Sequence, residues 1–120
     1  MLELKFKAWD KVKMKMFRPL AITFDTQSLA PFAVSVPGRS WEPIHKYELL
    51  QFTGLSDKNG VEVYQGDLFE IDSIFYRVIW DNESTSFKLQ SVVNSSTRDL
   101  SVVLCELLQG NIYQDSELLG

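Results

Sequence analysis

Closely spaced turn signals divide this sequence into short β-type runs, and that spacing constrains the fold more than any other feature. In residues 2–9, apolar side chains alternate with charged ones, a period of two that predicts a half-buried strand. The whole chain contains about eight or nine such runs, and no amphipathic helix longer than about two turns is evident. The pattern predicts a mainly β protein built as a barrel or a strongly bent sheet.

The first part of the chain is expected to begin with a hairpin. Residues 10–13 form the expected turn, and residues 14–17 the returning strand. Residues 31–45 contain three of the four prolines, and we read this stretch as mostly loop. It separates an N-terminal β section, residues 1–45, from a C-terminal section, residues 46–120, within a single domain.

The C-terminal section carries the clearest turn signals. Asp57-Lys58-Asn59-Gly60 predicts a tight reversal with a positive φ at its glycine, and Asp72-Ser73 predicts another. Strands are expected at residues 47–53, 68–71, 76–80, 87–93 and 110–113. Residues 100–108 fit either a short helix or a strand pair. The segment from Gly66 to Leu89 suits a small SH3-like barrel.

Histidine and cysteine are almost absent, which limits the chemistry. Cys105 is the only cysteine, so the fold has no internal disulfide, and its apolar neighbours predict a buried thiol. The only histidine, His45, lies in a polar, loop-like stretch, which disfavours a Cys–His nucleophile pair. The sequence contains no zinc-type spacing and no glycine-rich phosphate loop, and nothing selects a pair of carboxylates. We therefore expect no cofactor, no metal and no enzymatic activity.

Hydropathy indicates a cytoplasmic protein that does not associate with membranes. The N-terminus alternates lysine with apolar residues and lacks the continuous apolar region of a secretory signal. Apolar runs such as residues 30–34 and 102–105 are too short to span a bilayer.

Charge is distributed unevenly along the chain. Residues 1–18 carry a net charge of +4, whereas the remaining 102 residues carry −8. The candidate binding residues in this basic segment are Lys5, Lys7, Trp9, Lys13 and Lys15. Lysines that follow phosphates and aromatics that stack on bases are typical of proteins that bind single-stranded nucleic acid. The segment also suits an acidic protein surface, including another copy of the chain, or a solvated face whose lysines prevent edge-to-edge pairing.

Two tryptophans outside the expected hairpin differ in their predicted environments. Trp80 ends an apolar run, which predicts a place in the core. Trp41 stands in the proline-rich stretch near Arg39, where an exposed indole would mark an interface.

Three blocks of the sequence are distinctive. They are Lys-Phe-Lys-Ala-Trp-Asp at residues 5–10, the glycine- and aspartate-rich residues 51–67, and the block that begins with Gly-Asn-Ile-Tyr at residues 110–119. In these blocks the chain resembles the YopX-like family of proteins, which are encoded by phages and prophages of Gram-positive bacteria. The resemblance implies an SH3-type barrel in the C-terminal two-thirds, an N-terminal β section and a phage or prophage origin. It implies no established biochemical activity.

The middle block offers further candidate binding residues. Asp57, Tyr64 and Asp67 are close in sequence, and hairpin tips that carry them would form a ligand or partner surface. Alternatively, the glycines of the block supply chain reversals while the aspartates accept hydrogen bonds from turn amides. A calcium loop starting at Asp57 is disfavoured, because Val61 and Leu68 stand where oxygen ligands are required.

We therefore expect a non-enzymatic protein-interaction module with an unidentified protein partner, and self-association is an open alternative. The second hypothesis is a nucleic-acid-associated protein of phage replication or regulation that uses the basic N-terminal hairpin.

Overall fold

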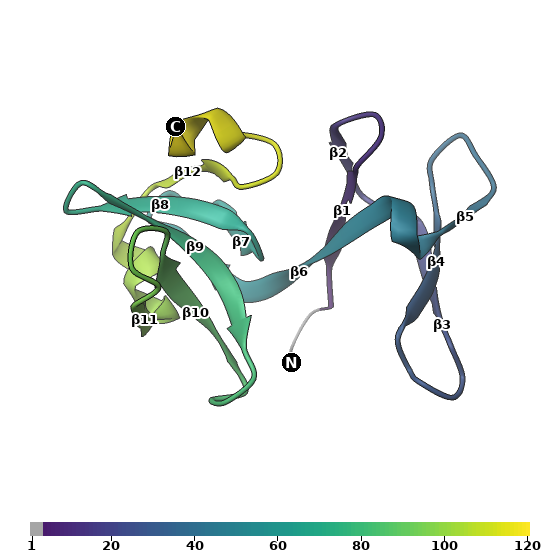
Figure 1. Ribbon diagram of the computed structural model, residues 1–120, viewed down its shortest axis with the longest axis horizontal. Helices are drawn as coiled ribbons and strands as arrows, with labels where there is room; N and C mark the ends of the chain where they lie inside the picture. Colours follow the sequence, from purple (N-terminus) through teal and green to yellow (C-terminus); the bar gives the residue numbers. More distant parts are fainter. Residues whose placement is uncertain (1–3) are drawn as a thin grey trace. The chain divides into compact units, whose positions relative to one another are not determined.

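A computed structural model describes residues 4–120 and shows a mainly β protein with curled antiparallel sheets (Figure 1). The mainly β fold predicted from the sequence is therefore confirmed. The chain divides into two compact units. Residues 6–50 form one, called here the N-terminal unit, and residues 51–120, together with residues 4 and 5, form the other, the C-terminal unit.

The N-terminal unit begins with the predicted hairpin. Strands β1 (Phe6–Asp10) and β2 (Lys15–Phe17) are antiparallel, with Ala8 opposite Phe17. Ala8 and its neighbour Trp9 are both buried, so neither face of β1 is open to solvent at this point. The expected turn and returning strand are confirmed.

A three-stranded antiparallel sheet completes this unit. Its strands are β3 (Ala21–Phe24), β4 (Pro31–Ser35) and β5 (Trp41–Pro43), in that order. The prediction that residues 31–45 are mostly loop is wrong, because two of these strands lie there. Pro31 and Pro43 stand at strand ends, where a missing N–H is tolerated, and Gly38 turns the chain with a φ of +80°. A short 3₁₀ helix, η1 (Ile44–Lys46), follows β5.

Strand β6 (Tyr47–Ser56) runs through the division between the two units. It pairs with β7 (Glu62–Tyr64), with Phe52 opposite Tyr64. The reversal between the two strands is the one predicted from the sequence, and Gly60 has a φ of +83° as expected.

The C-terminal unit is built around a five-stranded antiparallel sheet in the order β11-β10-β9-β8-β12. Its strands are β8 (Asp67–Ile71), β9 (Ile74–Asp81), β10 (Ser86–Ser91), β11 (Thr97–Asp99) and β12 (Leu108–Asn111). Asp72 and Ser73 join β8 to β9 with φ values of +51° and +66°, as a two-residue type I′ turn requires. The last strand, β12, returns to pair with β8. The edge strand β11 was not among the strands expected from the sequence.

The core of the C-terminal unit lies on one face of this sheet, where the buried side chains include Phe69, Val78 and Leu89. A 3₁₀ helix, η2 (Leu100–Cys105), adds Leu100 and Val103 to it. Because a 3₁₀ helix has three residues per turn, these two side chains lie above one another and point into the core. Cys105 falls outside that period and is exposed, so the predicted buried thiol is wrong. The chain ends with a further 3₁₀ helix, η3 (Ser116–Leu119).

Candidate functional site

Asp57, one of the predicted binding residues, is buried and bonded to backbone. Its Oδ1 atom accepts hydrogen bonds from the N–H groups of Asn59 (2.8 Å) and Val61 (2.9 Å). Its Oδ2 atom accepts from the N–H of Leu108 at 2.9 Å, which ties the β6–β7 turn to the start of β12. Burial alone would raise the pKa of this carboxyl, but the N–H donors of Leu108, Val61 and Asn59 outweigh it and lower the pKa.

Asp67 and Tyr64 are likewise part of the interior. Asp67 accepts hydrogen bonds from the N–H of Tyr64 at 2.7 Å and from the Nδ2 of Asn111 at 3.0 Å. The Tyr64 ring packs on Phe52 with the ring centroids 5.5 Å apart. The structural alternative for the middle block is therefore confirmed, and these three side chains do not form an exposed hairpin-tip surface.

The basic residues fall into the two units. Lys5 belongs to the C-terminal unit, where its ammonium pairs with Glu62 and lies 5.1 Å from the centre of the Phe52 ring. Lys7, Trp9, Lys13 and Lys15 belong to the N-terminal unit. Trp9 is only 5% exposed, so it offers no face on which a base could stack, and its proposed place in a nucleic-acid surface is wrong.

Lys13 and Lys15 are brought together beside Arg39 in a small pocket of about 210 Å³. The other residues that line it are Asp10, Met16, Phe17, Val36 and Pro37. Arg39 is paired with Glu42 at 3.3 Å. This basic pocket combines positive charge with apolar side chains.

Trp41 lies on β5 opposite Ser35 and is 49% exposed. The indole thus has the exposure that the interface hypothesis for Trp41 requires. Its neighbours on the same face of the sheet are small, so the ring projects from an open surface.

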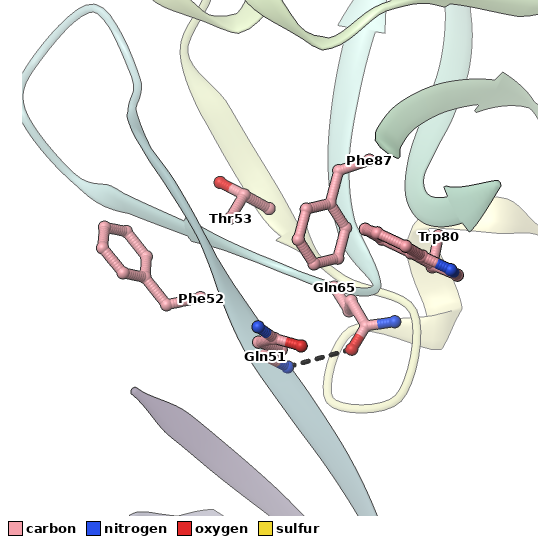
Figure 2. A pocket seen from close by; sticks show the side chains of 6 residues that line it. All are labelled: Gln51, Phe52, Thr53, Gln65, Trp80 and Phe87. Carbon is pink, nitrogen blue, oxygen red and sulfur yellow. Dashed lines mark hydrogen bonds between the residues drawn. The ribbon is translucent and has the colours of Figure 1, made fainter. Parts of the chain in front are cut away.

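The site that sequence reasoning missed is a pocket of about 440 Å³ in the C-terminal unit, called here the aromatic pocket (Figure 2). It is lined by Gln51, Phe52, Thr53, Gln65, Trp80 and Phe87. Figure 2 shows the aromatic rings of Phe87 and Trp80 side by side, with the two glutamine side chains next to them. None of the lining side chains carries a charge.

The aromatic wall of this pocket follows from strand register. Trp80 on β9 is directly opposite Phe87 on β10, and the next pair on the same face is Val78 with Leu89, which is core. The two rings meet edge to face, with centroids 5.0 Å apart. Trp80 thus lies on the face of the sheet that carries the core, but at the margin of the core, and it is 44% exposed. The prediction that Trp80 is a core residue is wrong for this reason.

The polar edge of the pocket comes from two glutamines. The backbone N–H of Gln51 donates to Gln65 Oε1, and the backbone N–H of Gln65 donates to the Gln51 carbonyl, both at 3.0 Å. These bonds fix the position of the Gln65 side chain. Within residues 4–120, the Nε2 of Gln65 and the side-chain amide of Gln51 make no hydrogen bond, so they are available to a ligand.

The sequence carried only part of the signal for this pocket. Strands were expected at residues 76–80 and 87–93, and pairing Asp81 with Ser86 places Trp80 opposite Phe87. The strand register depends on the length of the connecting turn, which the residue pattern does not determine.

Other kinds of site find little support in the part of the chain that is described. No group of three or more histidine, cysteine, aspartate or glutamate side chains within residues 4–120 is placed to hold a metal ion. None of the helices in this range has the length and apolar character needed to cross a membrane.

Comparison with known proteins gives the family. The family model described as YopX protein matches residues 5–120. The chain belongs to the YopX protein family. Among solved structures, the crystal structure of protein EF1440 from Enterococcus faecalis is similar over 100% of both chains, with 26% sequence identity and a TM-score of 0.75. No curated protein matches the chain.

Two of the three blocks that carried the YopX resemblance, the middle and the final one, meet in the structure. Asp67 of the middle block binds Asn111 of the final block, and Asp115 accepts a hydrogen bond from the Asn111 N–H at 2.9 Å. A Cβ atom at Gly110 would lie 2.8 Å from the Asp115 carboxylate, so only glycine fits there without a shift. These YopX blocks thus fasten β12 to the β7–β8 turn, which is a structural role.

Proposed function

We propose that this YopX protein is a non-enzymatic protein-interaction module whose aromatic pocket holds apolar side chains of a partner protein. The gene belongs to a phage or prophage, and the protein acts in the cytoplasm of the bacterial host as an accessory factor. The C-terminal unit is a small SH3-like barrel. The return of β12 to pair with β8, directly after a 3₁₀ helix, supports that assignment.

The aromatic pocket is the observation that carries this proposal. Binding sites for peptides and small ligands are concave and mainly apolar, with a few polar groups that fix orientation. Trp80 and Phe87 supply the apolar wall, and the free amide groups of Gln51 and Gln65 supply donors and an acceptor for a peptide backbone. Exposed tryptophan is also the side chain most enriched at interface hot spots.

A nucleic-acid partner has weaker support. The net charge of −4 opposes phosphate binding, and the burial of Trp9 removes the expected stacking surface. We expect little retention on single- or double-stranded DNA at moderate salt. Tight retention that is lost when Lys7, Lys13 and Lys15 are changed to Ala would favour the nucleic-acid hypothesis instead.

The test is selection of binding peptides from a displayed random library, followed by affinity measurement. We expect selected peptides to lose about tenfold or more in affinity for Trp80→Ala, since a central anchor is removed. Trp41→Ala is the matched control, because Trp41 is a similarly exposed tryptophan in the other unit. Loss of binding with Trp41→Ala and not with Trp80→Ala would overturn the proposed site, and so would a library that yields no binders.

A further inference from the structure

The tip of the β1–β2 hairpin exposes apolar side chains among lysines. The tip consists of residues 11–14, Lys-Val-Lys-Met, and is followed by Lys15. Val12 is 75% exposed and Met14 is 63% exposed. Apolar side chains that are this exposed at a turn can pack against a partner protein.

The tip is also held in one conformation. The buried carboxylate of Asp10 accepts hydrogen bonds from the N–H groups of Val12 and Lys13, both at 2.9 Å. The Met14 N–H donates to the Asp10 carbonyl at 2.8 Å, and Met14 takes a positive φ of +56°. A segment that is ordered before it binds loses less conformational entropy on docking.

Two of the three lysines at residues 11–15 form no ion pair within residues 4–120. Lys11 pairs with Glu48 at 3.2 Å, but among residues 4–120 neither the Lys13 nor the Lys15 ammonium pairs with a carboxylate. The N-terminal unit as a whole holds seven lysines and arginines and four acidic residues, a net charge of +3.

The C-terminal unit has the opposite charge. It holds five lysines and arginines and twelve acidic residues, a net charge of −7. Two of the acidic residues, Asp81 and Glu83, lie at the turn that directly follows Trp80. Glu83 is exposed and forms no ion pair with any residue from 4 to 120. The aromatic pocket is therefore uncharged itself but lies beside a negative loop.

We propose that the hairpin tip of a second copy of this chain docks in the aromatic pocket, which deepens the proposed function and rests on it. The thioether of Met14 and the side chain of Val12 contact Trp80 and Phe87, since sulfur–aromatic contacts are favourable. The lysines of the tip face the β9–β10 loop, where Glu83 is free to pair.

This contact is head to tail, because the tip and the pocket lie on different units of the chain. A heterologous contact leaves one tip and one pocket free at the ends of every assembly, so growth continues beyond the dimer unless a ring closes. Weak attraction between opposite charges makes the association sensitive to salt.

Sedimentation velocity of the full chain over a range of concentrations tests the proposal. We expect the wild-type chain to associate at high concentration and to dissociate as salt is raised. Met14→Asn removes the thioether, and asparagine tolerates the positive φ of this position. Trp80→Ala removes the wall of the pocket, and the surface change Glu83→Lys reverses a charge beside the pocket without altering the core. Each substitution is expected to weaken association by about tenfold or more, or several-fold for Glu83→Lys.

A mixture gives the decisive result. Met14→Asn keeps an intact pocket, and Trp80→Ala keeps an intact tip, so an equimolar mixture should form a one-to-one dimer although neither variant associates alone. A wild-type chain that stays monomeric at every concentration would overturn the proposal, as would association that Met14→Asn and Glu83→Lys leave unchanged. If the wild-type chain is monomeric while library peptides still require Trp80, the second-copy proposal fails and the proposed function stands.

Discussion

Asp57 connects two parts of the C-terminal unit that are 51 residues apart in sequence, through its hydrogen bond with the Leu108 N–H. Replacing it by Ala leaves the N–H groups of Asn59, Val61 and Leu108, which it bonds in partly buried surroundings, without that acceptor. We expect Asp57→Ala to lower the free energy of unfolding by about 1–3 kcal/mol. Denaturant unfolding measures this loss, and an unchanged midpoint would contradict the role given to Asp57.

Asp57 also makes the stability of the fold depend on pH under acidic conditions. The pKa of Asp57 is lower in the folded chain than its ordinary value of 3.8, so folding favours the ionised carboxylate over the protonated acid. The contribution of Asp57 to the free energy of unfolding is therefore complete above its ordinary pKa. It is lost as the pH falls through its lowered pKa. Unfolding curves recorded between roughly pH 5 and pH 2 should show a smaller loss of stability for Asp57→Asn than for the wild-type chain.

At this scale the sequence predicted backbone roles better than surface roles. Aspartate beside Asn-Gly indicates a turn whose amides need an acceptor, and Asp57 has that role. Trp80 and Cys105 were wrongly predicted to be buried. An apolar stretch indicates that an element is buried, but it does not show which of its residues reach the core. Strand register and helix type decide which residues reach the core, and neither can be predicted from the neighbouring residues alone.

At the scale of elements, the β8–β9 turn invites a test. Ser73 has a φ of +66°, which is unfavourable for a residue with a Cβ atom and costs roughly 1 kcal/mol. Ser73→Gly should relieve this strain and raise the thermal midpoint, or leave it unchanged because glycine also loosens the unfolded chain.

Gly60→Ala is the opposite change, because it adds a Cβ atom to a turn residue with a positive φ. Gly60 has a φ of +83°, and no atom lies within 4 Å of an added Cβ, so any loss of stability comes from the backbone alone. We expect Gly60→Ala to lower the thermal midpoint. A midpoint that rises for Gly60→Ala or falls for Ser73→Gly would contradict the turn assignments.

Turn chemistry also explains which elements could be predicted. Hairpins closed by Asp-Lys-Asn-Gly or Asp-Ser were found because glycine adopts a positive φ readily and aspartate accepts hydrogen bonds from turn amides. The sheet of β3, β4 and β5 was missed at residues 31–45, because prolines at strand ends gave the same signal as a loop.

At the scale of the whole molecule, charge is divided between the two units. The sequence showed a basic start and an acidic remainder, and the structure places the division at residue 50, giving +3 and −7. The family match could be predicted from three short blocks, whereas the aromatic pocket could not, since its residues come from β6, β9, β10 and the β7–β8 turn. Four of the six residues that line the pocket belong to the middle family block, whereas Trp80 and Phe87, which form its aromatic wall, lie outside all three blocks.

The central claim is that the aromatic pocket binds a partner, and the indole N–H signals of the three tryptophans test it directly. Trp9 is buried, whereas Trp41 and Trp80 are similarly exposed in different units. In a nuclear magnetic resonance titration with a peptide selected by the protein, we predict that the Trp80 signal shifts while those of Trp9 and Trp41 stay in place. A Trp80 signal that stays in place while the Trp41 signal shifts would contradict the account.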